Sequence, residues 1–387
     1  MTTTEPRTIG STAEAIERVR ELLPVLKQRA ARAEELRQVP PETVQDLKDA
    51  GLLRIPNPPR YGGYEMDIDT MFQVGMELGR ACGSTAWCSN VWGIHNWMVG
   101  HWPEQAQEEY FATGPDTLSS SSFAAMGKLT PVEGGFRMTG RWEFSSGSNA
   151  GTWALLGAMG EHGPVFTLVP RPEYQVLEDT WHVSGLKGTG SKDVVVEDAF
   201  VPAHRVIAMM GMGPTSPAHA LHGRDSYRLF GMAILPFTLC SPLVGMAQGA
   251  IDAFTERYTG KTGPGRSAES VALQLRLAES SAEVDTARLI VTHHTREMIE
   301  RVGRGETLSE LDRATYGRDI GFVAKLSVSA VNRLFEAAGG HSLFDSDPIQ
   351  RLWRDTHAGA HQMALYWDNL AEGYGRAAFG LPPIQLR

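Results

Sequence analysis

Residues 185–202 read GLKGTGSKDVVVEDAFVP, and this stretch decides the fold. Its three glycines, at positions 185, 188 and 190, predict a structural turn, because glycine reaches backbone conformations that other residues avoid. The β-branched run Val194–Val196 then predicts a strand. In a dinucleotide-binding loop, Gly-x-Gly-x-x-Gly opens a helix. Here Gly188-Thr-Gly190 precedes a strand, so the stretch predicts a turn that enters a sheet.

The residues around this stretch, from Leu118 to about Ile207, share its strand character. Apolar and polar residues alternate after the glycine pair at 134–135, and a short apolar run occurs at 153–157. Short alternating runs separated by glycine are typical of strands joined by tight turns. We therefore expect a compact β-barrel domain over residues 118–220.

Helical periodicity occurs on both sides of this domain. Pro24 is expected to kink or divide the first helix, and a last helix is expected from near Pro348 to about Gly380. Long amphipathic segments before that last helix predict a four-helix bundle. The chain is therefore α+β, with an N-terminal helical domain (1–117), the central β-barrel domain (118–220) and a C-terminal four-helix bundle (221–387). The other expected helices cover residues 12–36, 42–50, 67–79, 84–99, 232–259, 267–302 and 316–338.

The composition excludes several classes of function. The 387 residues carry a formal net charge of -9, and an acidic chain without long basic runs does not attract nucleic acid or an anionic membrane. No stretch approaches the roughly 20 unbroken apolar residues that span a bilayer, and no signal peptide is evident. We expect a cytoplasmic protein. Cys82, Cys88 and Cys240 are too few and too scattered for a disulfide framework or a zinc site, so buried thiols are expected.

The sequence lacks the motifs by which many redox enzymes bind their electron source. No Gly-x-Gly-x-x-Gly lies between a strand and a helix, and Gly211-Met-Gly213 lacks the third glycine. Walker, His-Glu-x-x-His and Gly-x-Ser-x-Gly motifs are absent as well. If the chain uses a redox cofactor, the reducing equivalents are expected to come from another protein.

Three stretches together resemble the acyl-CoA dehydrogenase superfamily, and the resemblance extends over residues 15–380. The third of them resembles one subgroup, the flavin-dependent aromatic hydroxylases that take reduced flavin from a separate reductase. This subgroup includes the oxygenase components for 4-hydroxyphenylacetate and for a secosteroid phenol. The stretches are SSSSF (119–123) with GGFRMTGRWEFSSG (134–147), the stretch at 185–202, and LFEAAGGH (334–341) with RLWRDTHAGAH (351–361).

This resemblance implies the oxygenase component of a two-component monooxygenase that hydroxylates a small aromatic, phenolic substrate. Reduced FMN or FAD would come from an NAD(P)H:flavin reductase, O2 would add to it as a C4a-hydroperoxide, and the chain would form a homotetramer. The dehydrogenases use a glutamate base, but residues 354–367 contain no glutamate and hold His357 and His361. Three alternatives stay open: an acyl-CoA dehydrogenase or oxidase, an N- or S-oxygenase of the same fold, and a helical binding or scaffold protein.

Histidines are the candidate acid–base residues. His361 is predicted to accept the phenol proton, because imidazole suits proton transfer near neutral pH. His357 lies one helical turn earlier and is placed to contact the substrate in the same cleft. His95 lies among tryptophans and is either a satisfied core residue or, as the resemblance implies, a catalytic residue against substrate or flavin. Trp92 either packs in the core or lines a flat aromatic pocket.

The resemblance also implies a flavin site around FSSG, residues 144–147. The Ser146 hydroxyl would contact flavin N5 and help to hold the oxygen adduct, and Phe144 would pack against the flavin ring. Ser121 and Ser122 would line the pyrimidine side of the flavin or the substrate hydroxyl. On the residues alone, the four serines from Ser119 are equally well a polar loop, and Ser-Ser-Gly is equally well a turn.

Two further features are assigned to the cofactor by the resemblance. Gly339 and Gly340 would let the backbone approach the cofactor of a neighbouring subunit, although glycines here are also typical of a helix C-cap. Arg257 and Arg266 follow a bundle helix at the place where the superfamily uses arginine on the cofactor phosphate, a group that guanidinium geometry matches. No metal site is predicted.

Overall fold

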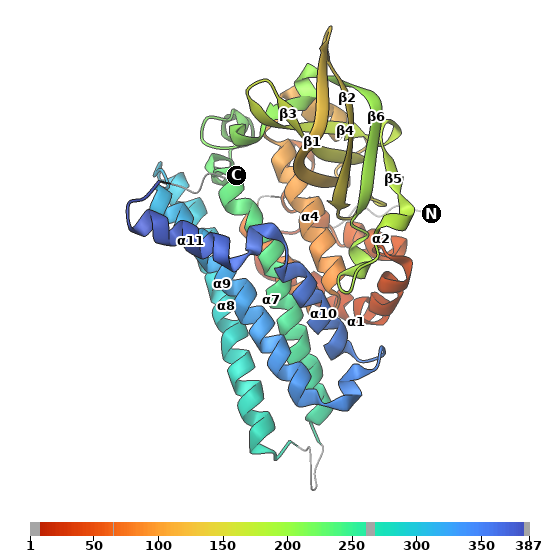
Figure 1. The fold of residues 1–387 in the computed structure, drawn as a ribbon, viewed down its shortest axis with the longest axis vertical. Coiled ribbons are helices and arrows are strands. Elements are labelled where there is room, and N and C mark those ends of the chain that lie inside the picture. Colours follow the sequence, from red (N-terminus) through yellow and green to blue (C-terminus); the bar gives the residue numbers. More distant parts are fainter. Residues whose placement is uncertain (1–7, 65, 261–267, 383–387) are drawn as a thin grey trace.

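The computed structural model describes residues 8–64, 66–260 and 268–382. Figure 1 shows an elongated molecule with a β-sheet at one end and long helices at the other. One helix, α4 (Gly83–Val99), runs from beneath the sheet toward the long helices. The helix–sheet–helix order predicted from the sequence is confirmed.

Helix α4 packs against α3, among other elements, and is buried along its whole length. The first helix was expected to be kinked or divided at Pro24, and the structure shows that it is not divided there. Buried contacts of Val19 and Leu26 on either side of Pro24 hold the helix in the core and offset the one lost hydrogen bond. The other helices of this region are α1 (Thr12–Leu36), α2 (Pro41–Asp49), α3 (Ile68–Gly79) and α5 (Glu104–Tyr110).

Within the described residues, seven strands form one mixed sheet with the order β5-β6-β2-β1-β3-β4-β7. Neighbouring strands are antiparallel except for β1 and β3, which are parallel. The sheet has its own small core around Met138, Trp142 and Val196. The strands are β1 (Ser119–Val132), β2 (Gly135–Ser145), β3 (Trp153–Gly160), β4 (Gly163–Pro170), β5 (Gln175–Leu177), β6 (Lys192–Pro202) and β7 (Val206–Ala208).

Long helices make up the C-terminal part. The sequence placed the start of the third bundle helix at residue 316, but it begins at Glu310, because Ser309 and Asp312 form a capping box that extends the helix by almost two turns. The helices are α6 (Ala218–His222), α7 (Gly231–Tyr258), α8 (Val271–Gly303), α9 (Glu310–Ala338), α10 (Pro348–Ala360) and α11 (Trp367–Ala378).

The single last helix expected from Pro348 to about Gly380 was also wrong, because the chain breaks between α10 and α11. His361 caps α10, and Gln362 adopts an extended conformation in which its side chain accepts a hydrogen bond from Ala364 N. A short 3₁₀ turn then leads into α11. His361 therefore stands at a helix end.

One helix of the bundle, α7, is long and apolar enough to cross a membrane by length and composition. In this fold 83% of its most apolar window is buried against the other helices, as in the central helix of a globular bundle. The expectation of buried thiols is confirmed: Cys82, Cys88 and Cys240 are free and buried.

Candidate active site

Side chains of helix α4, among them Trp87, Trp92 and His95, make hydrogen bonds to the sheet domain. The Trp87 indole N–H donates to Ser146 Oγ (3.1 Å), and the Trp92 indole N–H donates to the Gly147 carbonyl (3.3 Å). His95 Nδ1 lies 2.7 Å from the Ser119 carbonyl. The helix therefore fixes both the turn after β2 and the start of β1.

Ser146 also begins a chain of hydroxyl groups that leads into the glycine-rich turn. Ser146 Oγ lies 2.8 Å from Ser191 Oγ, which lies 2.7 Å from Thr189 Oγ1. Thr189 Oγ1 in turn donates to the Leu186 carbonyl (2.8 Å). Each hydroxyl has only one hydrogen to donate. The donor and acceptor roles along this series of hydroxyl groups are therefore set by the group at its end, the Leu186 carbonyl.

The direction follows step by step from the carbonyl, which can only accept. Thr189 spends its hydrogen on the Leu186 carbonyl, so Ser191 must donate to Thr189, and Ser146 must donate to Ser191. Trp87 can only donate, so Ser146 accepts from it. The Ser146 oxygen is left with one free lone pair and no free hydrogen, and it can offer a bound molecule only an acceptor.

Phe144 lies at an irregular point of β2. The register of β2 against β6 shifts between Trp142 and Ser145, and Phe144 has a positive φ of 62°. This conformation is uncommon for an aromatic residue, and such outliers cluster at functional sites. The Phe144 ring is 67% exposed and meets the Trp181 ring edge to face, at 5.9 Å between centroids. The bulge leaves an exposed aromatic residue two positions before Ser146.

His95 is buried and is held in one tautomer. Because the Ser119 carbonyl can only accept, Nδ1 carries the hydrogen and Nε2 keeps a free lone pair. Burial lowers the pKa of His95 to about 4, against the opposing effect of the hydrogen bond to Ser119. His95 is therefore neutral at neutral pH and can accept a hydrogen bond through Nε2.

The two histidines of α10 have different surroundings. His357 Nε2 donates to Asn332 Oδ1 (2.8 Å), which also accepts from the Trp353 indole (2.6 Å). Burial lowers the pKa of His357, and so does the neighbouring His361. His361 is exposed, and its Nδ1 donates to the His357 carbonyl (2.7 Å). His361 Nε2 is thus free to act as a base, whereas His357 Nε2 is engaged.

Close backbone approaches bring α10 against the glycine-rich turn and α4. A Cβ on Gly185 would lie 2.1 Å from the Arg354 carbonyl oxygen, and a Cβ on Gly359 would lie 3.2 Å from the Trp87 ring. The buried Asp355 carboxylate accepts from the Leu186 N–H at 2.6 Å. The three stretches singled out in the sequence therefore meet around Trp87 and the turn at 185–191.

The arginine predicted to bind phosphate and the glycine pair predicted to approach the cofactor lie near the end of α9, away from Ser146. Gly340 and Arg257 line a pocket of about 560 Å³. Arg257 forms an ion pair with Asp347, but its buried Nη1 has no hydrogen-bond partner within the described residues. Gly339 ends α9 with a φ of 72°, as expected for a helix cap. Arg266 lies outside the described residues.

The remaining predicted residues differ in their accessibility. Ser121 and Ser122 lie on β1 and are half-buried, in register with Leu155 and Leu156 of β3. Trp92 is completely buried. Its indole packs on Gly147, where a Cβ would meet Trp92 Nε1 at 2.3 Å, so the structure places Trp92 in the core.

Sequence reasoning missed four residues of this site: Trp181, Thr189, Ser191 and Asp355. Thr189 and Ser191 were visible in the GLKGTGS motif, but the motif was interpreted as a structural turn only. The sequence signal was the pair of hydroxyl residues two positions apart, which can lie close enough to hydrogen-bond each other. No local signal marked Asp355, whose partner is 169 residues away.

Comparison with known proteins identifies the class of protein that has this fold and site. Residues 13–114 match the family model "Acyl-CoA dehydrogenase, N-terminal domain", and residues 237–366 match "Acyl-CoA dehydrogenase, C-terminal domain". The chain belongs to the acyl-CoA dehydrogenase family, as its sequence motifs predicted.

Within this family the chain is similar to oxygenase components. It is 34% identical to the flavin-dependent monooxygenase oxygenase subunit HsaA of Rhodococcus jostii, over 95% of this chain and 98% of that one. It is 33% identical to the FADH(2)-dependent resorcinol hydroxylase oxygenase component of a Rhizobium species, over 95% and 94%. The structure of XiaF from a Streptomyces species, in complex with FADH2 and glycerol, superposes with a TM-score of 0.90 at 30% identity, over 97% of each chain. The prediction of a reduced-flavin-dependent monooxygenase is confirmed.

Proposed function

We propose that this chain is the oxygenase component of a two-component monooxygenase and hydroxylates a small phenolic substrate. The observation that carries the proposal is the Ser146 hydroxyl, held by Trp87 and Ser191 two positions after the exposed Phe144. Reduced FMN or FAD, supplied by an NAD(P)H:flavin reductase that binds transiently, activates O2 and delivers one oxygen atom to the ring. Hydroxylation of resorcinol and of p-hydroxyphenylacetate by relatives supports a phenolic substrate.

The chain's own residues fit a flavin. Ser146 presents a lone pair, which suits the N5–H group of a reduced flavin, and Phe144 presents a ring for packing against the flavin. Ser121 and Ser122 offer half-exposed hydroxyl groups on the adjacent strand. Arg257, which shares a pocket with Gly340, offers a charged donor suited to the phosphate of a flavin bound by a second copy of the chain.

The position of the Gly339–Gly340 turn supports assembly into a homotetramer. Figure 1 shows the connection between α9 and α10 at the end of the bundle remote from the sheet, whereas Ser146 directly follows β2 of that sheet. A flavin at Ser146 of one chain would reach this turn only in a second copy. Leu343 and Phe344 beside the turn are 73% and 63% exposed, and apolar side chains so exposed suit burial at a subunit contact.

Two histidines would have different roles toward the phenol: one removes its proton and the other orients its hydroxyl group. His361 has a free, exposed Nε2 and follows Gly359, which packs on Trp87, so it is placed to remove the phenol proton. His95, whose pKa burial lowers to about 4, is too weak a base for that step. It would instead orient the hydroxyl group through Nε2. Buried tryptophans along α4 would keep water out.

The test is direct oxygen transfer without the reductase. The purified chain is mixed anaerobically with chemically reduced FMN or FAD and then exposed to O2 with a panel of phenols, indoles and amines. We expect hydroxylated phenol, with little hydrogen peroxide when the substrate is present. Failure to bind reduced flavin, or oxidation of an acyl thioester by tightly bound FAD, would overturn the proposal.

A further inference from the structure

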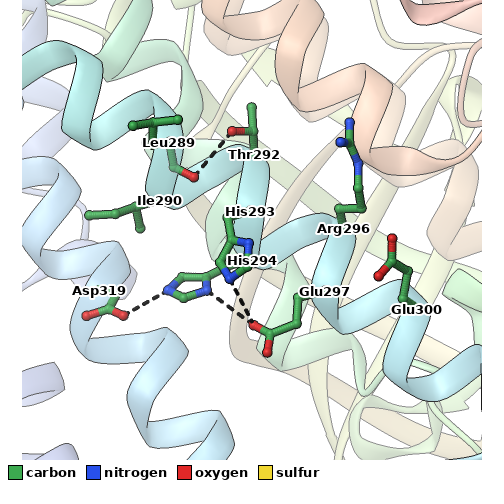
Figure 2. Close-up of a pocket in the computed structure, with 9 residues that line it drawn as sticks. All are labelled: Leu289, Ile290, Thr292, His293, His294, Arg296, Glu297, Glu300 and Asp319. Atoms are coloured by element: carbon green, nitrogen blue, oxygen red, sulfur yellow. Dashed lines mark hydrogen bonds and ion pairs between the residues drawn. The ribbon is translucent and has the colours of Figure 1, made fainter.

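A second group of chemically active side chains lies on α8, and it shares no residue with the candidate active site. His293, His294 and Glu297 project from one side of the helix toward a pocket of about 740 Å³, which Asp319 of α9 also lines (Figure 2). Glu297 Oε2 lies 3.6 Å from His294 Nδ1 and 3.8 Å from His293 Nε2. The ligand atoms of the three residues all lie within 4.8 Å of one another.

These distances are too long for hydrogen bonds and suit three donors around a small cation. His294 Nδ1 is buried and has no hydrogen-bond partner within the described part of the chain. In a tetrahedral site with bonds of about 2.0–2.2 Å, ligand atoms lie roughly 3.3–3.6 Å apart. The distance from Glu297 to His294 is at the upper end of this range, and the distance from Glu297 to His293 slightly exceeds it. The His293 side chain is 71% exposed and can rotate to close the gap.

His294 is oriented as a metal-binding histidine usually is. Its Nε2 lies 2.8 Å from Asp319 Oδ2, as the dashed lines in Figure 2 show. Arg318 also pairs with Asp319, at 2.7 Å. The Asp319 carboxylate accepts the hydrogen on His294 Nε2, which leaves the Nδ1 lone pair facing Glu297. A carboxylate behind a ligating imidazole is the common arrangement in metal sites.

We propose that His293 Nε2, His294 Nδ1 and a Glu297 carboxylate oxygen bind one divalent transition-metal ion of the Zn²⁺ class. Two imidazoles and one carboxylate favour such an ion over Mg²⁺ or Ca²⁺, which prefer oxygen ligands. Water completes the coordination. Asp319 belongs to α9, so the hydrogen bond that orients His294 links the proposed site to a second helix.

The charges around the cluster are compatible with a cation. Glu300 adds a carboxylate one turn further along α8. Three arginines in this region pair with carboxylates outside the three-ligand group: Arg318 with Asp319, Arg296 with Asp69, and Arg301 with Glu306 and Asp312. The ring of Tyr316 covers the other side of His294 edge to face, at 5.0 Å between centroids.

The experiment is Zn²⁺ titration of the chelator-treated full chain by calorimetry, with Co²⁺ absorbance as a second readout of ligand geometry. We expect one Zn²⁺ per chain and a d–d spectrum typical of tetrahedral Co²⁺. Glu297→Gln and His293→Asn should each weaken Zn²⁺ binding at least tenfold. Asp319→Asn should weaken it about tenfold while leaving the three ligands in place.

The matched control is His182→Asn. His182 forms a similar histidine–carboxylate pair with Asp179 three residues away (2.6 Å), but it belongs to no three-donor group among the described residues. This variant should bind Zn²⁺ as the wild type does. Melting curves in chelator show whether each variant is folded. The proposal is overturned if folded Glu297→Gln retains wild-type Zn²⁺ affinity, if binding is not stoichiometric, or if Mg²⁺ competes equally.

Discussion

The hydroxyl chain from Ser146 to the Leu186 carbonyl predicts that this protein distinguishes reduced from oxidised flavin by one hydrogen bond. Reduced flavin carries a hydrogen on N5 and donates, whereas oxidised flavin has a bare N5 and accepts. Ser146 has spent its hydrogen on Ser191, so it can only accept. The site therefore fits the reduced form and leaves oxidised N5 facing an oxygen lone pair.

Replacing Ser191 with alanine removes the acceptor that takes the Ser146 hydrogen. Ser146 could then donate to oxidised N5 while still accepting from the Trp87 indole. One neutral hydrogen bond contributes about 0.5–1.5 kcal/mol, which corresponds to a factor of roughly 2 to 13 in affinity. We expect the ratio of the Kd for oxidised flavin to the Kd for reduced flavin to fall about fivefold in Ser191→Ala.

The assay is a pair of flavin titrations, one in air with oxidised FMN and one anaerobic with reduced FMN. Thr189→Val removes the hydroxyl that accepts the Ser191 hydrogen. Ser191 can then donate to Ser146, which frees the Ser146 hydrogen for oxidised N5, so this variant should lower the same ratio. Ser148→Ala is the matched control: its hydroxyl donates to the Gly190 carbonyl (3.1 Å) in the same region but outside the chain. An unchanged ratio in Ser191→Ala, or an equal change in Ser148→Ala, would refute the argument.

Three other substitutions test separate parts of the site. His361→Ala should lower the rate of hydroxylation about 100-fold with flavin Kd unchanged; unaltered product formation would remove the assignment of the base. Arg257→Gln should weaken binding of FMN or FAD about tenfold but not that of riboflavin, which lacks phosphate; equal losses in a titration would contradict a phosphate contact. Asp355→Asn should stabilise the folded chain at pH 7–8 by up to about 3 kcal/mol, measured by urea unfolding across pH, because burial raises the pKa of this carboxyl to about 6. The folded chain favours the protonated acid, so its stabilising effect is complete below about pH 4 and is lost as pH rises to about 6; a variant with the wild-type pH profile would contradict this.

Local patterns in the sequence predicted much of the fold. Apolar spacing located α3 and α4 almost to the residue, because each helix starts or ends at a local signal such as the Asp67 cap. The break after α10 was missed because Gly359 lies within the helix and neither glycine nor proline directly follows it. The break depends on the hydrogen bond that the Gln362 side chain accepts from Ala364 N, and apolar periodicity does not reveal such a bond.

Residues of the candidate site could be predicted only where the residue type within a short motif indicates its role. Ser146 and His361 stand in short motifs, and the resemblance to a family assigned them roles. The tautomers of the histidines and the direction of the hydroxyl chain depend on carbonyls at Ser119, Leu186 and His357, whose positions follow from packing alone. Backbone acceptors have no sequence signature, so this information had to come from the structure.

The glycine-rich turn carries both the architecture and the chemistry of this protein. Gly185 lets α10 approach until Asp355 can accept from Leu186 N–H, and this contact also fixes the residue whose carbonyl ends the hydroxyl chain. Any side chain at position 185 would move α10 away, because the Arg354 carbonyl oxygen already occupies the Cβ position. Moving α10 would disturb Leu186 and, through the three hydrogen bonds that follow, the orientation of the Ser146 hydroxyl. It would also lower the stability of the fold. A protein that receives its electrons from a partner needs a site ordered before the reduced flavin arrives, and the turn provides that order from backbone atoms.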